Sequence, residues 1–172
     1  VAVEDIVAAA LTLTKSQLNR DGISLLVDMN PDLPPVFAHL QQIQQVVLNL
    51  ISNARYALNQ KYPAADKKKV LHIETEVRAK GGKPFVRLSF LDRGTGIAAA
   101  VLPKVMDPFY STKLSGSGTG LGLSISHGII KDHDGELRIF SEEGNYTRVI
   151  VDLPAGQRPC NDEKREGASC NV

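Results

Sequence analysis

The chain has 172 residues, of which 42% are hydrophobic and 23% charged, and its formal net charge at pH 7 is +1. This length suits one domain with a buried core, and the near-neutral charge gives no reason to expect nucleic acid or an anionic membrane as a partner. No apolar stretch approaches the roughly 20 residues of a membrane span. Cys160 and Cys170 lie outside any patterned segment, which favours incidental thiols over a disulfide framework or a metal site. We expect a cytoplasmic domain without direct membrane contact, in a parent protein that can be membrane-anchored.

Hydrophobic periodicity predicts three helices and five strands. In chain order these are a helix at 3–18, a strand at 23–29, a helix at 39–59, strands at 70–77 and 84–92, a helix at 119–132, and strands at 135–142 and 146–154. The lysine-rich segment 61–69 is expected to be a solvated connector. Because most of the strands come in hairpin-like pairs, the order argues against a doubly wound parallel sheet. It predicts an α+β fold, a two-layer α/β sandwich with a mixed sheet and helices on one face.

The segment GSGTGLGLS (116–124) has the glycine density of a phosphate-binding loop. It is not a P-loop, because Gly122 is followed by Leu123 rather than by lysine. It is not a Rossmann fingerprint either, because no strand precedes it. A glycine-rich loop that enters a helix remains, and the first-turn amides of such a helix form an anion site. Those amides belong to Gly118, Thr119, Gly120 and Leu121; a flexible linker before an ordinary helix is the alternative.

Two asparagines stand one helical turn apart in NLISNA (49–54), so Asn49 and Asn53 point the same way. Side-chain amide oxygens can ligate Mg²⁺ while waters and phosphates complete the octahedron. Two ordinary helix-surface asparagines would give the same spacing.

Two further segments carry groups suited to a nucleotide. In DRGTGI (92–97), Asp92 ends a strand, where its carboxylate can accept a hydrogen bond from an exocyclic amine. Gly94 and Gly96 would let the backbone approach a flat ring, although D-x-G is also a common turn. In DPFYSTK (107–113), Lys113 would supply a compact charge for a terminal phosphate, or be one more surface lysine.

Together these four segments resemble the N, G1, F and G2 boxes of the ATP-binding catalytic domain of sensor histidine kinases, in the superfamily of gyrase, Hsp90 and MutL. The resemblance runs from about residue 4 to residue 154. It rests on the wording QQVVLNLISNARYAL, DRGTGI, PFYSTK, GTGLGLSIS and YTRVIVDLP. The PF-x-x-TK form is similar to that of nitrogen- and dicarboxylate-sensing kinases. The resemblance implies a Bergerat-type ATP-binding fold, with ATP on the sheet beneath a flexible lid at about 98–118.

The resemblance also implies roles for individual residues. Asn53 would coordinate Mg²⁺ with ATP phosphates and waters, Asp92 would read the adenine amino group, and Lys113 would lie near the γ-phosphate. Asn53 and Lys113 are the implied catalytic residues. The adenine wall would be Gly94, Gly96 and Ile97, with Thr147 near the base. The remaining residues implied in ATP binding are Asn49, Arg55, Tyr56, Ala57, the lid anchor Phe109, Thr112, Gly118, Thr119, Gly120, Leu121, Gly122 and Leu123.

This sequence departs from the family pattern in a few places. A lysine or similar residue often follows the metal asparagine, and here either Arg55 or Tyr56 would reach phosphate. Arg93 replaces a commoner asparagine. None of His39, His72, His127 and His133 resembles an acceptor histidine, and His133 is expected to cap a helix end.

The expected organisation is a connector helix at 1–20, a catalytic domain at 21–154 and a disordered tail at 155–172. The implied partners are the parent's dimerisation domain, which carries the acceptor histidine, and the receiver domain of a response regulator. An ATPase clamp of the gyrase type is an alternative, disfavoured because Asn49 stands where such clamps commonly place a water-activating glutamate. A non-catalytic nucleotide-binding module is the other.

Overall fold

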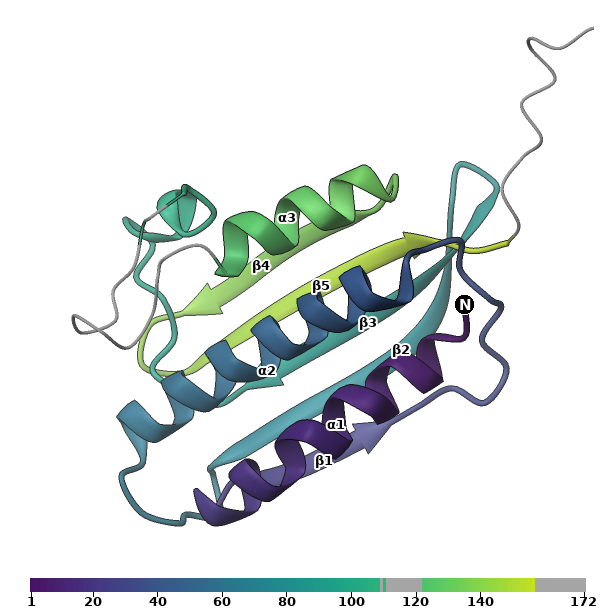
Figure 1. Cartoon of the computed structure of the whole chain (residues 1–172). Helices are drawn as coiled ribbons and strands as arrows, with labels where there is room; N and C mark the ends of the chain where they lie inside the picture. The colour runs from purple at the N-terminus through teal and green to yellow at the C-terminus, as the bar shows by residue number, and fades with distance from the viewer. Residues whose placement is uncertain (109, 111–121, 157–172) are drawn as a thin grey trace, which may run out of the picture.

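The computed structural model describes residues 1–108, 110 and 122–156 (Figure 1). Every predicted helix and strand is present, with ends shifted by up to three residues. The elements are α1 (Val3–Arg20), β1 (Ser24–Asp28), α2 (Leu40–Lys61), β2 (Val70–Lys80), β3 (Lys83–Asp92), the 3₁₀ turn η1 (Leu102–Lys104), α3 (Gly122–Asp132), β4 (Glu136–Glu142) and β5 (Tyr146–Pro154). The periodicity did not predict η1, and the predicted helix residues 119–121 lie outside the described residues.

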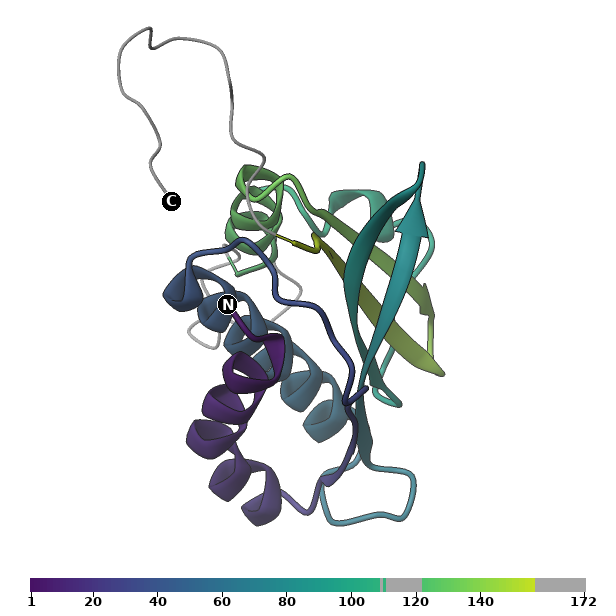
Figure 2. The same cartoon turned by 90° about the vertical axis from the view of Figure 1, so that its right-hand side faces the viewer.

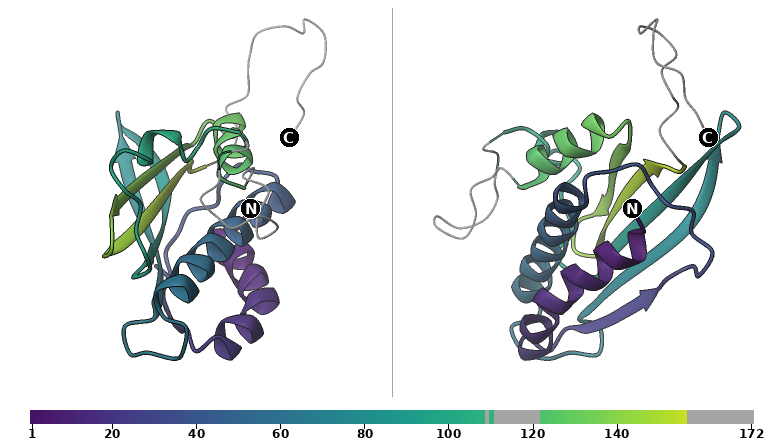
Figure 3. Two further views of the ribbon diagram at one scale, coloured as in Figure 1. Left: turned by 90° about the vertical axis from the view of Figure 1, so that its left-hand side faces the viewer. Right: turned by 45° about the vertical axis from the view of Figure 1, so that its right-hand side comes forward.

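The five strands form one mixed sheet in the order β1-β2-β3-β5-β4. β1 pairs with β2 in parallel, and the other neighbours are antiparallel. The β2–β3 hairpin turns at Gly81 and Gly82, which both have positive φ as a tight turn requires. All three α-helices lie on one side of this sheet (Figures 2 and 3). The predicted two-layer sandwich with helices on one face is therefore confirmed.

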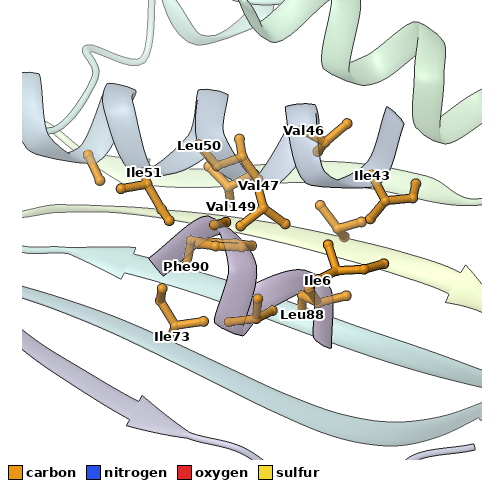
Figure 4. Packing of buried hydrophobic residues seen from close by; sticks show 14 of the residues in the cluster. Ile6, Ile43, Val46, Val47, Leu50, Ile51, Ile73, Leu88, Phe90 and Val149 are labelled. Atoms are coloured by element: carbon orange, nitrogen blue, oxygen red, sulfur yellow. The ribbon is translucent and has the colours of Figure 1, made fainter. Parts of the chain in front are cut away.

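The core lies between the helices and the sheet. The apolar stripe of α2 is buried along its length, from Ile43 to Leu58. It packs with side chains from β2, β3 and β5 and with Ile6 of α1 (Figure 4). Burying one such side chain contributes about 1.5–3 kcal/mol relative to leaving it exposed. This packing holds α2 along the sheet and so fixes one wall of the cavity described below.

A polar cluster joins the C-terminal end of α1 to α2 and to the start of β2. Arg55 and Asn59 of α2 both donate to the Asp21 carboxylate, Asn59 at 2.8 Å. The hydrogen bond from Arg55 is the main cause that lowers the pKa of Asp21. Lys69, which is only 1% exposed, donates from Nζ to the Asp21 carbonyl oxygen at 2.6 Å. The prediction of a solvated connector at 61–69 is therefore wrong for its last residue.

Candidate functional site

A cavity of about 510 Å³ opens between α2, the ends of β3 and β5 and the segment that follows β3. This volume falls within the range of about 300–1,000 Å³ typical of small-ligand sites. Its lining is mostly apolar, with a few polar groups that converge on it. The lining includes Asn49, Asn53, Tyr56, Ala57, Phe90, Asp92, Gly96, Ile97, Gly122, Leu123, Ile139, Thr147 and Val149.

Asp92 is the buried carboxyl of this cavity. It is 5% exposed, and its Oδ1 accepts a hydrogen bond from the Gly94 amide at 2.9 Å. Burial raises the pKa of Asp92 to about 7, against the opposing effect of the Gly94 hydrogen bond. No carboxylate-to-cation pair involves Asp92 among the residues that the structure describes. A buried carboxyl without an ion partner, at a cavity wall, is a group poised to receive a ligand donor.

A hydroxyl cluster stands beside Asp92. Thr147 of β5 pairs with Asp92 in the β3–β5 register, and its Oγ1 lies 2.9 Å from the Ser141 hydroxyl. Ser141 donates to the Tyr146 carbonyl at 2.7 Å and accepts from the Ile97 amide at 2.8 Å. Because the one hydroxyl proton of Ser141 is used on Tyr146, Thr147 donates to Ser141. Sequence reasoning missed Ser141, whose only signal was a polar residue at an inward strand position.

The two glycines after β3 are required by close approaches of the backbone. A Cβ at Gly94 would lie 2.7 Å from both Ala57 and Asp92 Oδ1. Gly96 has φ +65°, and a Cβ there would overlap the Glu142 carbonyl oxygen. Gly94 itself does not line the cavity, but it lets α2 lie against the end of β3.

Asn49 and Asn53 line the cavity from α2, one turn apart as predicted. Asn49 Nδ2 lies 3.3 Å from Ser126 Oγ and 3.4 Å from the Gly122 carbonyl oxygen. Ser126 is fully buried and donates to the same carbonyl at 2.7 Å. Asn49 therefore also ties α2 to the first turn of α3 beside the cavity.

The structure brings together ten of the residues that the sequence assigned to the site. They are Asn49, Asn53, Tyr56, Ala57, Asp92, Gly96, Ile97, Gly122, Leu123 and Thr147. It does not bring Arg55 there, because the guanidinium of Arg55 bonds Asp21 and the residue is not part of the cavity lining. Seven further residues lie outside the described part of the chain: Phe109, Thr112, Lys113, Gly118, Thr119, Gly120 and Leu121.

Sequence reasoning also missed the apolar lining. Phe90 comes from β3, whereas Ile139 and Val149 pair in the β4–β5 hairpin, so the lining forms only when this hairpin lies beside β3 in the sheet. Their alternating pattern marked them as inward-facing, which is equally true of ordinary core residues.

The family model of histidine kinase-, DNA gyrase B- and HSP90-like ATPases matches residues 38–157. The chain is 40% identical over 157 residues to sensor kinase CckA of Brucella abortus. The matched region covers 86% of this chain and 16% of CckA. The chain is 31% identical over 173 residues to sporulation kinase E of Bacillus subtilis, covering 95% and 20%. It is 32% identical over 154 residues to sensor histidine kinase ZraS of Escherichia coli, covering 90% and 30%. The chain thus spans less than a third of these relatives.

Solved structures of histidine kinases have the same fold as this chain. The catalytic domain of histidine kinase ThkA superposes with a TM-score of 0.71 at 26% identity, over 88% of this chain and 91% of that one. Full-length ShkA in complex with AMPPNP superposes with a TM-score of 0.72 at 22% identity, over 92% and 31%. The resemblance drawn from the four boxes is confirmed: this chain belongs to the histidine kinase-, DNA gyrase B- and HSP90-like ATPase family, and its relatives are sensor histidine kinases.

Proposed function

We propose that this chain is the ATP-binding catalytic domain of a two-component sensor histidine kinase. It binds Mg–ATP and presents the γ-phosphate to a histidine of a dimerisation domain, from which phosphate passes to a response regulator aspartate. The observation that carries this proposal is Asp92, a buried carboxyl with no ion partner among the described residues, at the wall of a mostly apolar cavity. The AMPPNP held by ShkA, a protein of the same fold, is consistent with it.

The adenine ring would lie among Phe90, Ile97 and Val149, with its amino group donating to the Asp92 carboxylate. The Thr147–Ser141–Ile97 hydrogen bonds would hold the adenine wall in place, because they fix the backbone of Ile97 to β4 and β5. A ring held this way leaves the phosphates pointing toward the α3 end of the cavity, where the first-turn amides of a helix favour anions. The proposed lid at about 98–118 and Lys113 would close over them.

The metal donors proposed here are few, which suits Mg²⁺. Asn53 would supply an amide oxygen, with Asn49 one turn away, and phosphates and waters would complete the octahedron. No group of three or more His, Cys, Asp or Glu able to hold a metal occurs among the described residues. A resident all-protein metal cage is therefore not what these residues offer, whereas a metal carried in with phosphates fits. Mg²⁺ would supply neutralisation of phosphate charge, and this chain's own part is to orient the nucleotide.

The acceptor histidine is proposed to lie in the parent's dimerisation domain. His133 is engaged at the end of α3, with Nδ1 2.7 Å from the Ile129 carbonyl and Nε2 accepting from the His39 amide at 3.0 Å. His72 lies 2.6 Å from the Asp28 carboxylate on the sheet. These two histidines have structural partners. Residues 1–20 would be the connector from the dimerisation domain, and α1 is already packed into the core through Val3 and Ile6.

The test is phosphotransfer to the parent protein's dimerisation domain, added in trans with ATP and Mg²⁺. We expect acid-labile, base-stable phosphate on that domain, and loss of most of it with Asn53→Ala. Asn19→Ala, an exposed asparagine on α1, is the matched control and should keep activity. Rapid phosphate release without transfer would favour an ATPase clamp instead. ATP binding with neither transfer nor release would favour a non-catalytic module.

A further inference from the structure

The sheet face turned away from the helices carries a second hollow, of about 480 Å³, which we call the rear hollow. It is built on β3, β4 and β5, beside the uncovered side of the sheet seen in Figure 2. Its middle row runs across three strands, because Leu91 pairs with Arg148 and Arg148 pairs with Phe140. The lining residues are Leu91, Arg93, Phe140, Tyr146, Arg148 and Ile150.

The rear hollow lies directly behind the cavity that contains Asp92. Side chains of a strand alternate between its two faces. Asp92 and Thr147 therefore face the cavity while their neighbours Arg93 and Arg148 face the rear hollow. The same alternation places Ile139 and Phe140 on opposite faces of β4. One layer of strands thus separates the two sites.

The charges in the rear hollow differ from those on the rest of this face. Arg78 pairs with Glu76, and Arg87 and Arg138 share the buried carboxylate of Asp152. By contrast, neither Arg93 nor Arg148 has a carboxylate within ion-pair distance in the described part of the chain. Two guanidinium groups that form no ion pair among the described residues therefore line one hollow. An anion bound between them would accept charge-assisted hydrogen bonds from both.

The apolar part of the hollow is suited to a flat ring. Phe140 is 46% exposed, a large value for an aromatic residue in the middle of a strand. Tyr146 adds a second ring, and Leu91 and Ile150 supply aliphatic surface. Aromatic side chains pack against planar groups by offset stacking or edge contacts, and arginine binds phosphate through paired N–H groups.

We propose that the rear hollow binds a small planar aromatic phosphate, a ligand of the nucleotide class, independently of the nucleotide in the front cavity. The ring lies against Phe140 and Tyr146, and the phosphate lies between Arg93 and Arg148. The size of the hollow is that of a small-ligand site. Its two aromatic rings suit the planar ring of such a ligand, and its two arginines, which have no carboxylate partner among the described residues, suit the phosphate. This site goes beyond the proposed function and does not depend on it.

The experiment is a fluorescence titration of flavin mononucleotide with the 172-residue chain, with riboflavin as the probe that lacks the phosphate. We expect saturable quenching that Asp92→Asn in the front cavity leaves unchanged, and at least about tenfold weaker binding of riboflavin, since hydrogen bonds to charged groups contribute about 1.5–3 kcal/mol. Arg148→Gln and Arg93→Gln should each weaken flavin mononucleotide binding at least about threefold. Arg78→Gln, an arginine of the same face that is paired with Glu76, is the matched control and should bind as the wild type does.

Several results would overturn the proposal. These are no saturable quenching at millimolar probe, loss of the quenching in Asp92→Asn, or equal binding by the wild type and both hollow variants while all melt at the same temperature. Concentration-dependent dimerisation that Phe140→Ser abolishes would instead assign this face to a second copy of the chain. ATP binding is measured separately in the same samples, so failure here leaves the proposed function standing.

Discussion

At Asp92 the stability of the fold favours a protonated carboxyl, whereas the proposed contact with adenine requires an ionised one. Burial raises the pKa of Asp92 to about 7, from an ordinary value of 3.8. Between these two values the folded state holds a proton that the unfolded state has released, so stability falls as pH rises from about 4 to about 7 and stays at the lower level above. Keeping an ionised Asp92 above neutral pH therefore costs stability, and the proposed contact with the adenine amino group would offset that cost when ligand is bound.

Asp92→Asn should stabilise the ligand-free chain, because an amide keeps the shape and the Gly94 hydrogen bond without a buried charge. The expected gain in the free energy of unfolding is on the order of a few kcal/mol at pH 8 and clearly smaller at pH 5. Urea denaturation of wild type and variant at both pH values measures it. A difference that is the same at pH 5 and pH 8 would show that Asp92 does not titrate as described.

ATP affinity of the wild type should weaken as pH falls below about 7, by up to tenfold per pH unit, because a protonated carboxyl is a poorer acceptor for the adenine amino group. The measurement is the dissociation constant between pH 5.5 and 8.5. ATP itself titrates in this range, so Asp92→Asn provides the baseline. Parallel pH profiles for the two proteins would contradict an ionised Asp92 in the complex.

A substitution at Gly96 tests the backbone of the proposed adenine wall. Gly96→Ala should destabilise the chain by several kcal/mol or prevent folding, because φ +65° is unfavourable for alanine and the added Cβ would overlap the Glu142 carbonyl. Gly128→Ala in α3 is the control, since nothing lies within 4 Å of its added Cβ and alanine favours helix. Thermal melts compare the two, and equal melting temperatures would refute this reading of Gly96.

At the scale of elements, α2 carries two sets of polar residues on different faces. Asn49, Asn53 and Tyr56 face the cavity, whereas Arg55 lies two residues after Asn53, about 200° around the helix. Helical geometry alone predicts that Arg55 points away from the cavity. The resemblance implied a phosphate contact for Arg55 only because Arg55 closely follows Asn53 in the sequence. Its partner Asp21 is 34 residues away along the chain, and no local pattern joins them.

Asp21→Ala should lower the free energy of unfolding by about 1–3 kcal/mol, because it removes the acceptor of Arg55 and Asn59 at the α1–α2 junction. Asp32→Ala in the exposed loop after β1 is the control and should change stability by less than about 0.5 kcal/mol. Chemical denaturation of the wild type and both variants measures these changes in the free energy of unfolding. ATP affinity should change little, since neither Asp21 nor Arg55 lines the cavity.

At the scale of the whole molecule, the elements were predictable and their arrangement was less so. Apolar residues with helical or alternating spacing marked each helix and strand, and the hairpin-like pairs indicated a mixed sheet. No periodicity predicts that β5 lies between β3 and β4 or that β1 runs parallel to β2. The burial of Lys69 was hidden for the same reason, because its acceptor is the backbone of Asp21 on another element.

The candidate site was predictable where a single segment of the sequence carries both the polar groups and the residues that set the local backbone. The glycines after Asp92 and the asparagine pair of α2 are of this kind. The apolar lining, Ser141 and the rear hollow arise only when β3, β4 and β5 lie side by side. Motifs thus indicated the polar groups of the cavity, whereas the packing of distant strands completes it.

The most direct test of the account is calorimetric titration of the chain with ATP, with and without Mg²⁺, at pH 8, for the wild type and for Asp92→Asn. We expect Mg²⁺-dependent binding of ATP by the wild type and at least about tenfold weaker binding by the variant, which should be more stable when ligand-free. Equal affinity of the two proteins for ATP, or no binding by a well-folded wild type, would contradict it.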